Sequence, residues 1–156
     1  MQALQLDSID IKLLQYLQED SSKTTKELAQ LLHLTPTPVH ERLKRLERDG
    51  IIKKYVALLD HAKLNKTLIV FCNIKLKQHD LAIGKKFVEE ITSLEEVTEV
   101  YNVAGEYDFM LKVIVSDMPS YQHFIMYKLG SIANIGSTQS VFVLGQIKNS
   151  TAIPLI

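Results

Sequence analysis

The first third of the chain carries apolar residues at the spacing of three short α-helices. This spacing predicts a first helix over residues 7–19 and a short second helix that begins with the capping-box pair Thr24 and Glu27. A third helix is predicted over residues 35–49, because a threonine can cap it, a proline fits its first turn and a glycine follows its end. This order of a helix, a short helix, a brief turn and a third helix predicts a helix-turn-helix.

The third predicted helix has an apolar stripe on one side and small polar or cationic residues on the other. The stripe consists of Val39, Leu43 and Leu46, at steps of four and three residues. A buried seam, polar groups at the tip and cations further along suit a helix that lies in a DNA major groove. The alternative interpretation is an ordinary amphipathic helix whose charged face is merely solvated.

Ten residues are predicted to contact DNA, with base edges as the targets of the helix tip and phosphates as the targets of the cations. The tip residues are Thr35, Thr37, Pro38, His40 and Glu41. The cations are Lys44, Arg45 and Arg48 on the helix and Lys53 and Lys54 beyond it. Arg42 flanks the apolar stripe, so it either contacts DNA or packs on the domain with its guanidinium paired to a nearby acid.

The segment that follows the third helix is prone to form a strand. Residues 51–59 are mostly β-branched, aromatic or aliphatic, and two adjacent lysines among them could meet phosphate as a wing. We therefore expect a winged helix-turn-helix domain with a linker strand over residues 1–60.

Beyond residue 60 the pattern changes to strands and helices in alternation. Apolar or alternating runs predict strands at 68–77, 97–103, 107–115 and 141–144, and helical spacing predicts helices over 81–91 and 117–132. The inner faces of these helices are expected to be Leu81, Phe87, Val88 and Ile91, and then Tyr121, Phe124, Ile125 and Leu129. The order βαββαβ predicts a ferredoxin-like sandwich over residues 61–156, and the whole chain is therefore of the α+β class.

Two helices can cover only one face of a four-stranded sheet. Residues 68–72 and 141–144 are apolar on both alternations, so the second face also needs cover. A second copy of the sheet is the simplest cover, which predicts a two-fold dimer through this half of the chain. The alternative is that the amino-terminal domain folds back onto that face.

Composition limits the other classes of function. The net charge is zero, but residues 35–55 hold six cationic and three acidic side chains, so the charge is locally basic at the third helix. Cys72 is the single cysteine and excludes an internal disulfide or a cysteine-based zinc site, and the histidines lack metal-site spacing. No signal sequence or membrane-length apolar run is visible, so we expect a cytoplasmic protein that needs no metal or other cofactor.

Four stretches of the sequence together resemble the Lrp/AsnC family, the leucine-responsive and asparagine-operon regulators of prokaryotes. These stretches are Leu6-Asp7 with Asp10, the run LTPTPVHERLKRLERDGIIKKY followed by ALLD, the run VAGEYDFMLKVIVSDMPSY, and the final strand. The resemblance implies a sequence-specific DNA-binding transcriptional regulator with a βαββαβ effector domain. It also implies dimers that assemble into octamers, and amino-acid effectors bound where dimers meet.

The resemblance also assigns candidate effector residues. The family's Gly-Asp-Tyr-Asp loop falls on Gly105, Glu106, Tyr107 and Asp108, with glutamate in place of the first aspartate. Asp108 is then the partner of the effector's ammonium, or else a turn carboxylate satisfied by backbone N–H groups, and Gly105 lets the backbone approach the ligand. Across the dimer contact, the hydroxyls of Thr138 and Ser140 would meet the effector's carboxylate. Ala133 and Asn134 replace the Pro-Gly of many relatives, which leaves the effector's identity open.

Functions of other classes remain as alternatives. An enzyme could use Glu106 and Asp108 as acid and base near His123, but no nucleophile, phosphate-loop or metal motif accompanies them. An amino-acid sensor that does not bind DNA would leave the third helix unexplained. A ligand-independent architectural DNA-binding protein would leave the effector loop unexplained.

Overall fold

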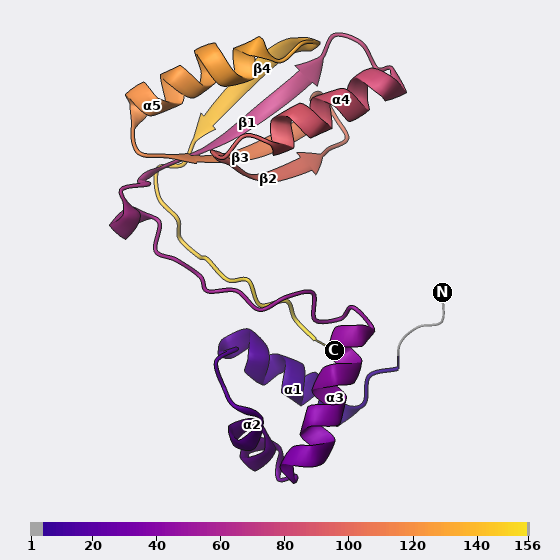
Figure 1. Cartoon of the computed structure of the whole chain (residues 1–156). Coiled ribbons are helices and arrows are strands. Elements are labelled where there is room, and N and C mark those ends of the chain that lie inside the picture. The colour runs from indigo at the N-terminus through magenta and orange to yellow at the C-terminus, as the bar shows by residue number, and fades with distance from the viewer. Residues whose placement is uncertain (1–4, 156) are drawn as a thin grey trace. The chain divides into compact units, whose positions relative to one another are not determined.

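The computed structural model describes residues 5–155, which form two compact units (Figure 1). The first unit holds the residues up to Leu58 together with the segment from Lys148 onward, and the second unit is Leu59–Ile147. The expected boundary at residue 60 is close to the observed one, but the carboxy-terminal segment was expected in the second domain. It groups with the first unit because Gln18 exchanges two hydrogen bonds with the backbone of Ile153, at 3.1 and 2.7 Å. The extreme ends of both expected domains, residues 1–4 and 156, lie outside the described residues.

The first unit is built from α1 (Ser8–Glu19), α2 (Thr25–Leu32) and α3 (Pro36–Arg48), as the sequence pattern predicted. Asp7 caps α1, and the predicted capping box of Thr24 and Glu27 begins α2. The core of this unit brings together apolar side chains of all three helices, namely Leu13, Leu14, Leu28, Ala29, Val39, Leu43 and Leu46.

Thr35 lies at the N-cap position of α3, but its side chain makes no capping hydrogen bond, contrary to the expectation. An N-cap hydroxyl normally accepts from the N–H of the second or third helical residue. The third helical residue here is Pro38, which has no N–H to donate. The helix is therefore begun by the fixed backbone of its prolines rather than by the threonine hydroxyl.

Residues 53–60 form no strand in the described chain, contrary to the expectation of a wing or linker strand. Ile51 and Ile52 donate back to the carbonyl of Leu46, which closes the end of α3. No strand of the described residues lies beside residues 53–60 to pair with their backbone. A β-prone sequence without a partner strand leaves its N–H and C=O groups to solvent.

The second unit has the predicted βαββαβ order, with β1 (Leu68–Leu76), α4 (Leu81–Thr92), β2 (Val97–Asn102), β3 (Phe109–Val115), α5 (Met118–His123) and β4 (Ile135–Phe142). The four strands form one antiparallel sheet in the order β2-β3-β1-β4 (Figure 1). Both helices contribute to one core against the same face of β1, where Val70, Cys72 and Ile74 are fully buried. The ferredoxin-like arrangement is thus confirmed.

Two segments of the second unit differ in detail from the prediction. A single helix was expected over residues 117–132. Instead, the short helix α5 is followed by a π-helical turn at Phe124–Lys128 and a 3-10 turn at Leu129–Ser131. The last strand begins at Ile135 and ends at Phe142, earlier than the expected 141–144. The polar residues of β4 obscured this strand in a search for apolar runs, yet residues 137–142 pair with β1 in regular register, and the register shifts only where β4 begins, between Lys75 and Leu76 of β1.

Two aliphatic side chains of α4 are more exposed than the sequence predicted. Phe87 and Ile91 are buried as expected, but Leu81 is 77% exposed and Val88 is 37% exposed. Cys72 is fully buried, and this burial raises the pKa of its thiol to about 11, which fits a small core residue. Among the described residues, none of the helices has the length and apolar character needed to span a membrane.

Candidate functional site

The outer face of α3 carries most of the residues predicted to contact DNA. Those that are exposed are Thr35, Thr37, His40, Glu41, Lys44 and Arg48. Pro38 and Arg45 are half-buried, and Lys53 and Lys54 are exposed just beyond the helix. The buried stripe of Val39, Leu43 and Leu46 holds the opposite face against α1 and α2, as predicted.

The cations along α3 are not all free to reach phosphate. Lys44 and Arg48 make only surface pairs, with Glu47 at 2.9 Å and Asp49 at 3.4 Å, and their side chains are 62% and 74% exposed. Exposed pairs of this kind are worth about 0–1 kcal/mol, so both cations can exchange their partners for phosphate. Lys44 and Arg48 are therefore the best-placed cations of α3.

Asp10 fixes the other two arginines of α3 from within the core. Its side chain is 1% exposed, and its two oxygens accept from Arg42 at 2.7 Å and from Arg45 at 2.5 Å. Arg42 also pairs with Asp7 at 2.6 Å, and these two carboxylates raise the pKa of the Arg42 guanidinium. The geometry favours the packed alternative for Arg42, and it commits part of the Arg45 guanidinium to the inside of the unit.

The ion group of Asp10, Arg42 and Arg45 was not predicted from the sequence, in which Asp10 served only as part of the family resemblance. A signal was present, because Asp10 lies three residues before Leu13 and so falls on the inner face of α1. A carboxylate at such a position needs a buried cationic or hydrogen-bonding partner. Arginines at the flank of the neighbouring apolar stripe were the available candidates.

In the second unit, the predicted effector loop connects β2 to β3. Gly105 adopts a φ of +140°, a conformation that side chains disfavour, and Glu106 is exposed. Asp108 lies at the end of the loop, where its Oδ2 accepts from the backbone N–H of Leu76 at 2.7 Å. Its Oδ1 lies 2.9 Å from Nε2 of His79. The Leu76 N–H and the His79 imidazole hold the pKa of Asp108 below its usual range, so this carboxylate is anionic at neutral pH.

Asp108 and His79 line a cavity of about 620 Å³ beside α4. The two exposed apolar side chains of α4, Leu81 and Val88, line the same cavity, as does the cation Lys85. A fixed anion, a cation and an apolar wall in one cavity complement a small zwitterion with an apolar side chain.

Thr138 and Ser140, the other predicted effector residues, do not line this cavity in their own chain. Thr138 lines a separate cavity of about 490 Å³ between the end of the α5 segment and β4. The hydroxyl of Ser140 lies 2.6 Å from that of Tyr121. A site that joins these hydroxyls to Asp108 would need a second chain, as the predicted dimer contact supposes.

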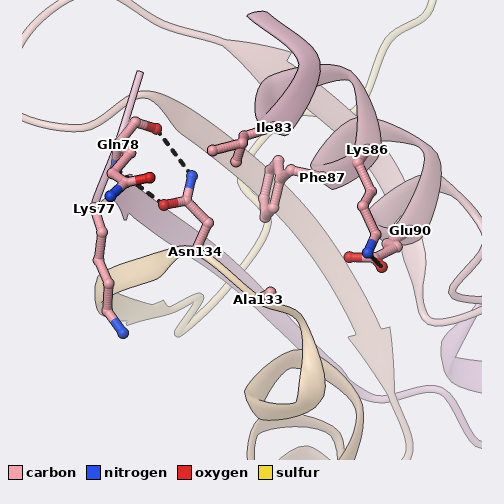
Figure 2. Close-up of a pocket in the computed structure, with 8 residues that line it drawn as sticks. All are labelled: Lys77, Gln78, Ile83, Lys86, Phe87, Glu90, Ala133 and Asn134. Atoms are coloured by element: carbon pink, nitrogen blue, oxygen red, sulfur yellow. Dashed lines mark hydrogen bonds and ion pairs between the residues drawn. The ribbon is translucent and has the colours of Figure 1, made fainter. Parts of the chain in front are cut away.

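A third hollow of about 370 Å³ lies on the other side of α4 (Figure 2). Ile83 and Phe87 supply its apolar wall, and Lys86 lies 3.8 Å from Glu90 along the helix. Figure 2 shows the side chain of Asn134 turned to the backbone of Gln78, which it contacts at both the N–H and the C=O. Asn134 therefore holds the segment that runs from β1 to α4, and His79 belongs to that segment.

The groups required by the enzyme alternative are not assembled in the described chain. His123 packs against Tyr127 with the two rings tilted by 40° and their centroids 5.0 Å apart, and it lines a different cavity from Asp108. Glu106 is exposed on the loop and lines no cavity with Asp108. Within residues 5–155, no three histidine, cysteine or acidic side chains gather as metal ligands would.

Two protein families match the chain. The Lrp/AsnC ligand binding domain matches residues 69–153, and a winged helix-turn-helix DNA-binding domain matches residues 6–53. The curated relatives include the DNA-binding transcriptional activator DecR of Escherichia coli, which is 40% identical over 96% of this chain and 99% of its own length. The leucine-responsive regulatory protein of Rhizobium meliloti is 32% identical over 97% of both chains.

Solved structures agree with this match. A transcriptional regulator of Neisseria meningitidis in complex with L-Met is 35% identical, with a TM-score of 0.92 over 96% of this chain and 97% of its own. An AsnC family regulator of Agrobacterium tumefaciens is 36% identical, with a TM-score of 0.91 over the same shares.

Proposed function

Because this chain belongs to the Lrp/AsnC family of transcriptional regulators, we propose that an amino acid bound beside Asp108 controls how its helix-turn-helix unit occupies DNA. The chain is a DNA-binding regulator with an amino-acid-binding domain, and not an enzyme. The observation that carries the proposed site is the cavity in which the fixed carboxylate of Asp108 lies beside exposed apolar side chains of α4. An ammonium needs such an anion, and an aliphatic side chain needs such a wall.

On DNA, the proposed role of α3 is to enter the major groove with its amino-terminal end. Thr37, Pro38, His40 and Glu41 would meet base edges, while Lys44, Arg48, Lys53 and Lys54 would meet phosphates. Exposure of all of these except the half-buried Pro38 supports the assignment. Arg45 would add a weaker contact from the part of its guanidinium that Asp10 leaves free. The cytoplasm, where promoter DNA is accessible, is the proposed location.

We assign Asp108 as the partner of the effector's ammonium. The backbone of residues 105–107 would lie close to the effector. Thr138 and Ser140 of a neighbouring chain would bind the carboxylate, because their own chain holds them outside the Asp108 cavity. The Neisseria relative was solved with L-Met. Leu81 and Val88 offer the wall that such a side chain would use, so aliphatic amino acids are the proposed class.

A dimer is proposed through the face of the sheet opposite the helices. On that face, Phe71 of β1 pairs with Val141 of β4, and Val141 is 46% exposed although it is aliphatic. A second sheet would cover this patch, and dimers of that kind would then assemble into octamers. Sedimentation at micromolar concentration measures this directly, with a dimer or larger as the expected species and a folded monomer as the contradicting one.

The proposed function predicts that one or a few aliphatic amino acids raise the melting temperature of the protein. A ligand at a hundred times its Kd adds about 2.7 kcal/mol of stability, at roughly 2–4 °C per kcal/mol for a chain of this size. The measurement is a thermal melt of the full chain with each of the twenty amino acids.

The matched control is Asp108→Asn. An asparagine oxygen can still accept from the Leu76 N–H, so the fold is retained while the anion is lost. The shift should disappear in this variant. Melting temperatures unchanged by every amino acid in the unsubstituted protein would instead favour a ligand-independent DNA-binding protein.

A further inference from the structure

The two oxygens of Asp108 have partners of very different permanence. Oδ2 accepts from the backbone N–H of Leu76, the last residue of β1, which is 6% exposed and held in the sheet. Oδ1 contacts the imidazole of His79, a side chain that is 64% exposed and lies in the segment between β1 and α4. An incoming cation can therefore displace His79, whereas it cannot displace Leu76 without disturbing the sheet.

His79 is also held close to Asp108 by a clamp on the residue before it. The side chain of Asn134 accepts from the N–H of Gln78 at 3.0 Å and donates to its C=O at 2.9 Å (Figure 2). The backbone C=O of Asn134 accepts from the N–H of Lys77 at 2.9 Å. Three hydrogen bonds thus fix residues 77–78, which restricts how far the adjacent His79 can move from the carboxylate.

We propose that His79 competes with the effector's ammonium for Asp108, and that the Asn134 clamp sets how strongly it competes. The inference rests on the proposed function, because it assumes that the ammonium binds at Asp108. The imidazole lies 2.9 Å from Oδ1, so an ammonium that takes this position on Oδ1 has to replace the imidazole, while the Leu76 N–H keeps its place on Oδ2. His79 then lowers the affinity for amino acids and determines which effector concentrations the protein answers to.

The test measures the affinity of the full chain for L-methionine and L-leucine by calorimetry. His79→Ala should bind both amino acids about tenfold more tightly than the unsubstituted protein does, as expected for the loss of one competing hydrogen bond to a charged group.

Two further variants separate competition from a change in shape. Asn134→Gly keeps the backbone φ of 70° accessible but removes the clamp, so it should shift affinity in the same direction as His79→Ala. Gln78→Ala is the matched control, because the clamp uses only the backbone of Gln78, and it should change nothing. The 2-hydroxy acid analogue of methionine lacks the ammonium, so its binding should not respond to His79→Ala.

Equal or weaker binding of the amino acids by His79→Ala would overturn the competition while leaving the proposed function in place. If the unsubstituted protein binds neither amino acid, and none of the twenty raises its melting temperature, the proposed function fails and the competition fails with it.

Discussion

Asp10→Asn should destabilise the helix-turn-helix unit by about 3 kcal/mol, since removing one member of a buried ion pair costs about 3–5 kcal/mol and the arginines here are partly exposed. The substitution would leave Arg45 without its anion and Arg42 with Asp7 alone. Because both arginines lie on α3, the helix would lose these polar contacts with α1 and would be held to it only by the apolar core that the two helices share. The measurement is urea unfolding of the full chain, followed by DNA binding under conditions where the variant remains folded.

Glu19→Gln is the matched control for this prediction. Glu19 lies at the end of the same helix α1 and is exposed, and no hydrogen bond or ion pair of its side chain is seen among the described residues. The Glu19→Gln variant should unfold at the same urea concentration as the unsubstituted protein. Equal stability of Asp10→Asn and Glu19→Gln would mean that the buried ion group does not hold the unit together.

Reversing the charge at Lys44 and Arg48 together should abolish DNA binding while leaving the fold and the oligomeric state intact. Both side chains are exposed, and the surface pairs they would lose contribute about 0–1 kcal/mol each. The slope of log affinity against log salt concentration is negative, and its magnitude should decrease by about 0.9 for each phosphate contact removed. Arg45 is left unchanged, because its pairing with Asp10 would confuse a loss of contact with a loss of structure.

The double variant Lys12→Glu with Lys148→Glu introduces the same change of charge elsewhere in the same unit, at two exposed lysines. It should keep most of the affinity of the unsubstituted protein for DNA. If Lys44→Glu with Arg48→Glu bound as tightly as this control, α3 would not be the helix that lies on DNA.

Local patterns predicted the elements of this protein well, because each element is encoded by residues close together in the chain. The capping box of Thr24 and Glu27 and the helical apolar spacing placed α1, α2 and α3 almost to the residue. The order of strands and helices then predicted the second fold. The side chain of Thr35 makes no capping hydrogen bond, and Pro38, three residues further on, has no N–H to offer it; this proline is visible in the sequence.

Contacts between distant residues could not be predicted in the same way. Asp10 meets Arg42 and Arg45 across more than thirty positions, and Asp108 meets His79 across 29. The spacing of apolar residues along a sequence does not indicate which distant side chains the fold brings together. The exposure of Leu81 and Val88 was missed for a related reason, since helical spacing gives the apolar face of a helix but not how much of that face the sheet covers.

The central claim is that amino-acid binding in the second unit changes DNA occupancy by the first. The most direct measurement is a nuclease-protection titration on the DNA upstream of this protein's own gene, with and without an amino acid that raises its melting temperature. We expect discrete protected sites whose half-saturation changes when the amino acid is added, and no such change in Asp108→Asn. An identical titration with saturating amino acid bound would contradict the claim.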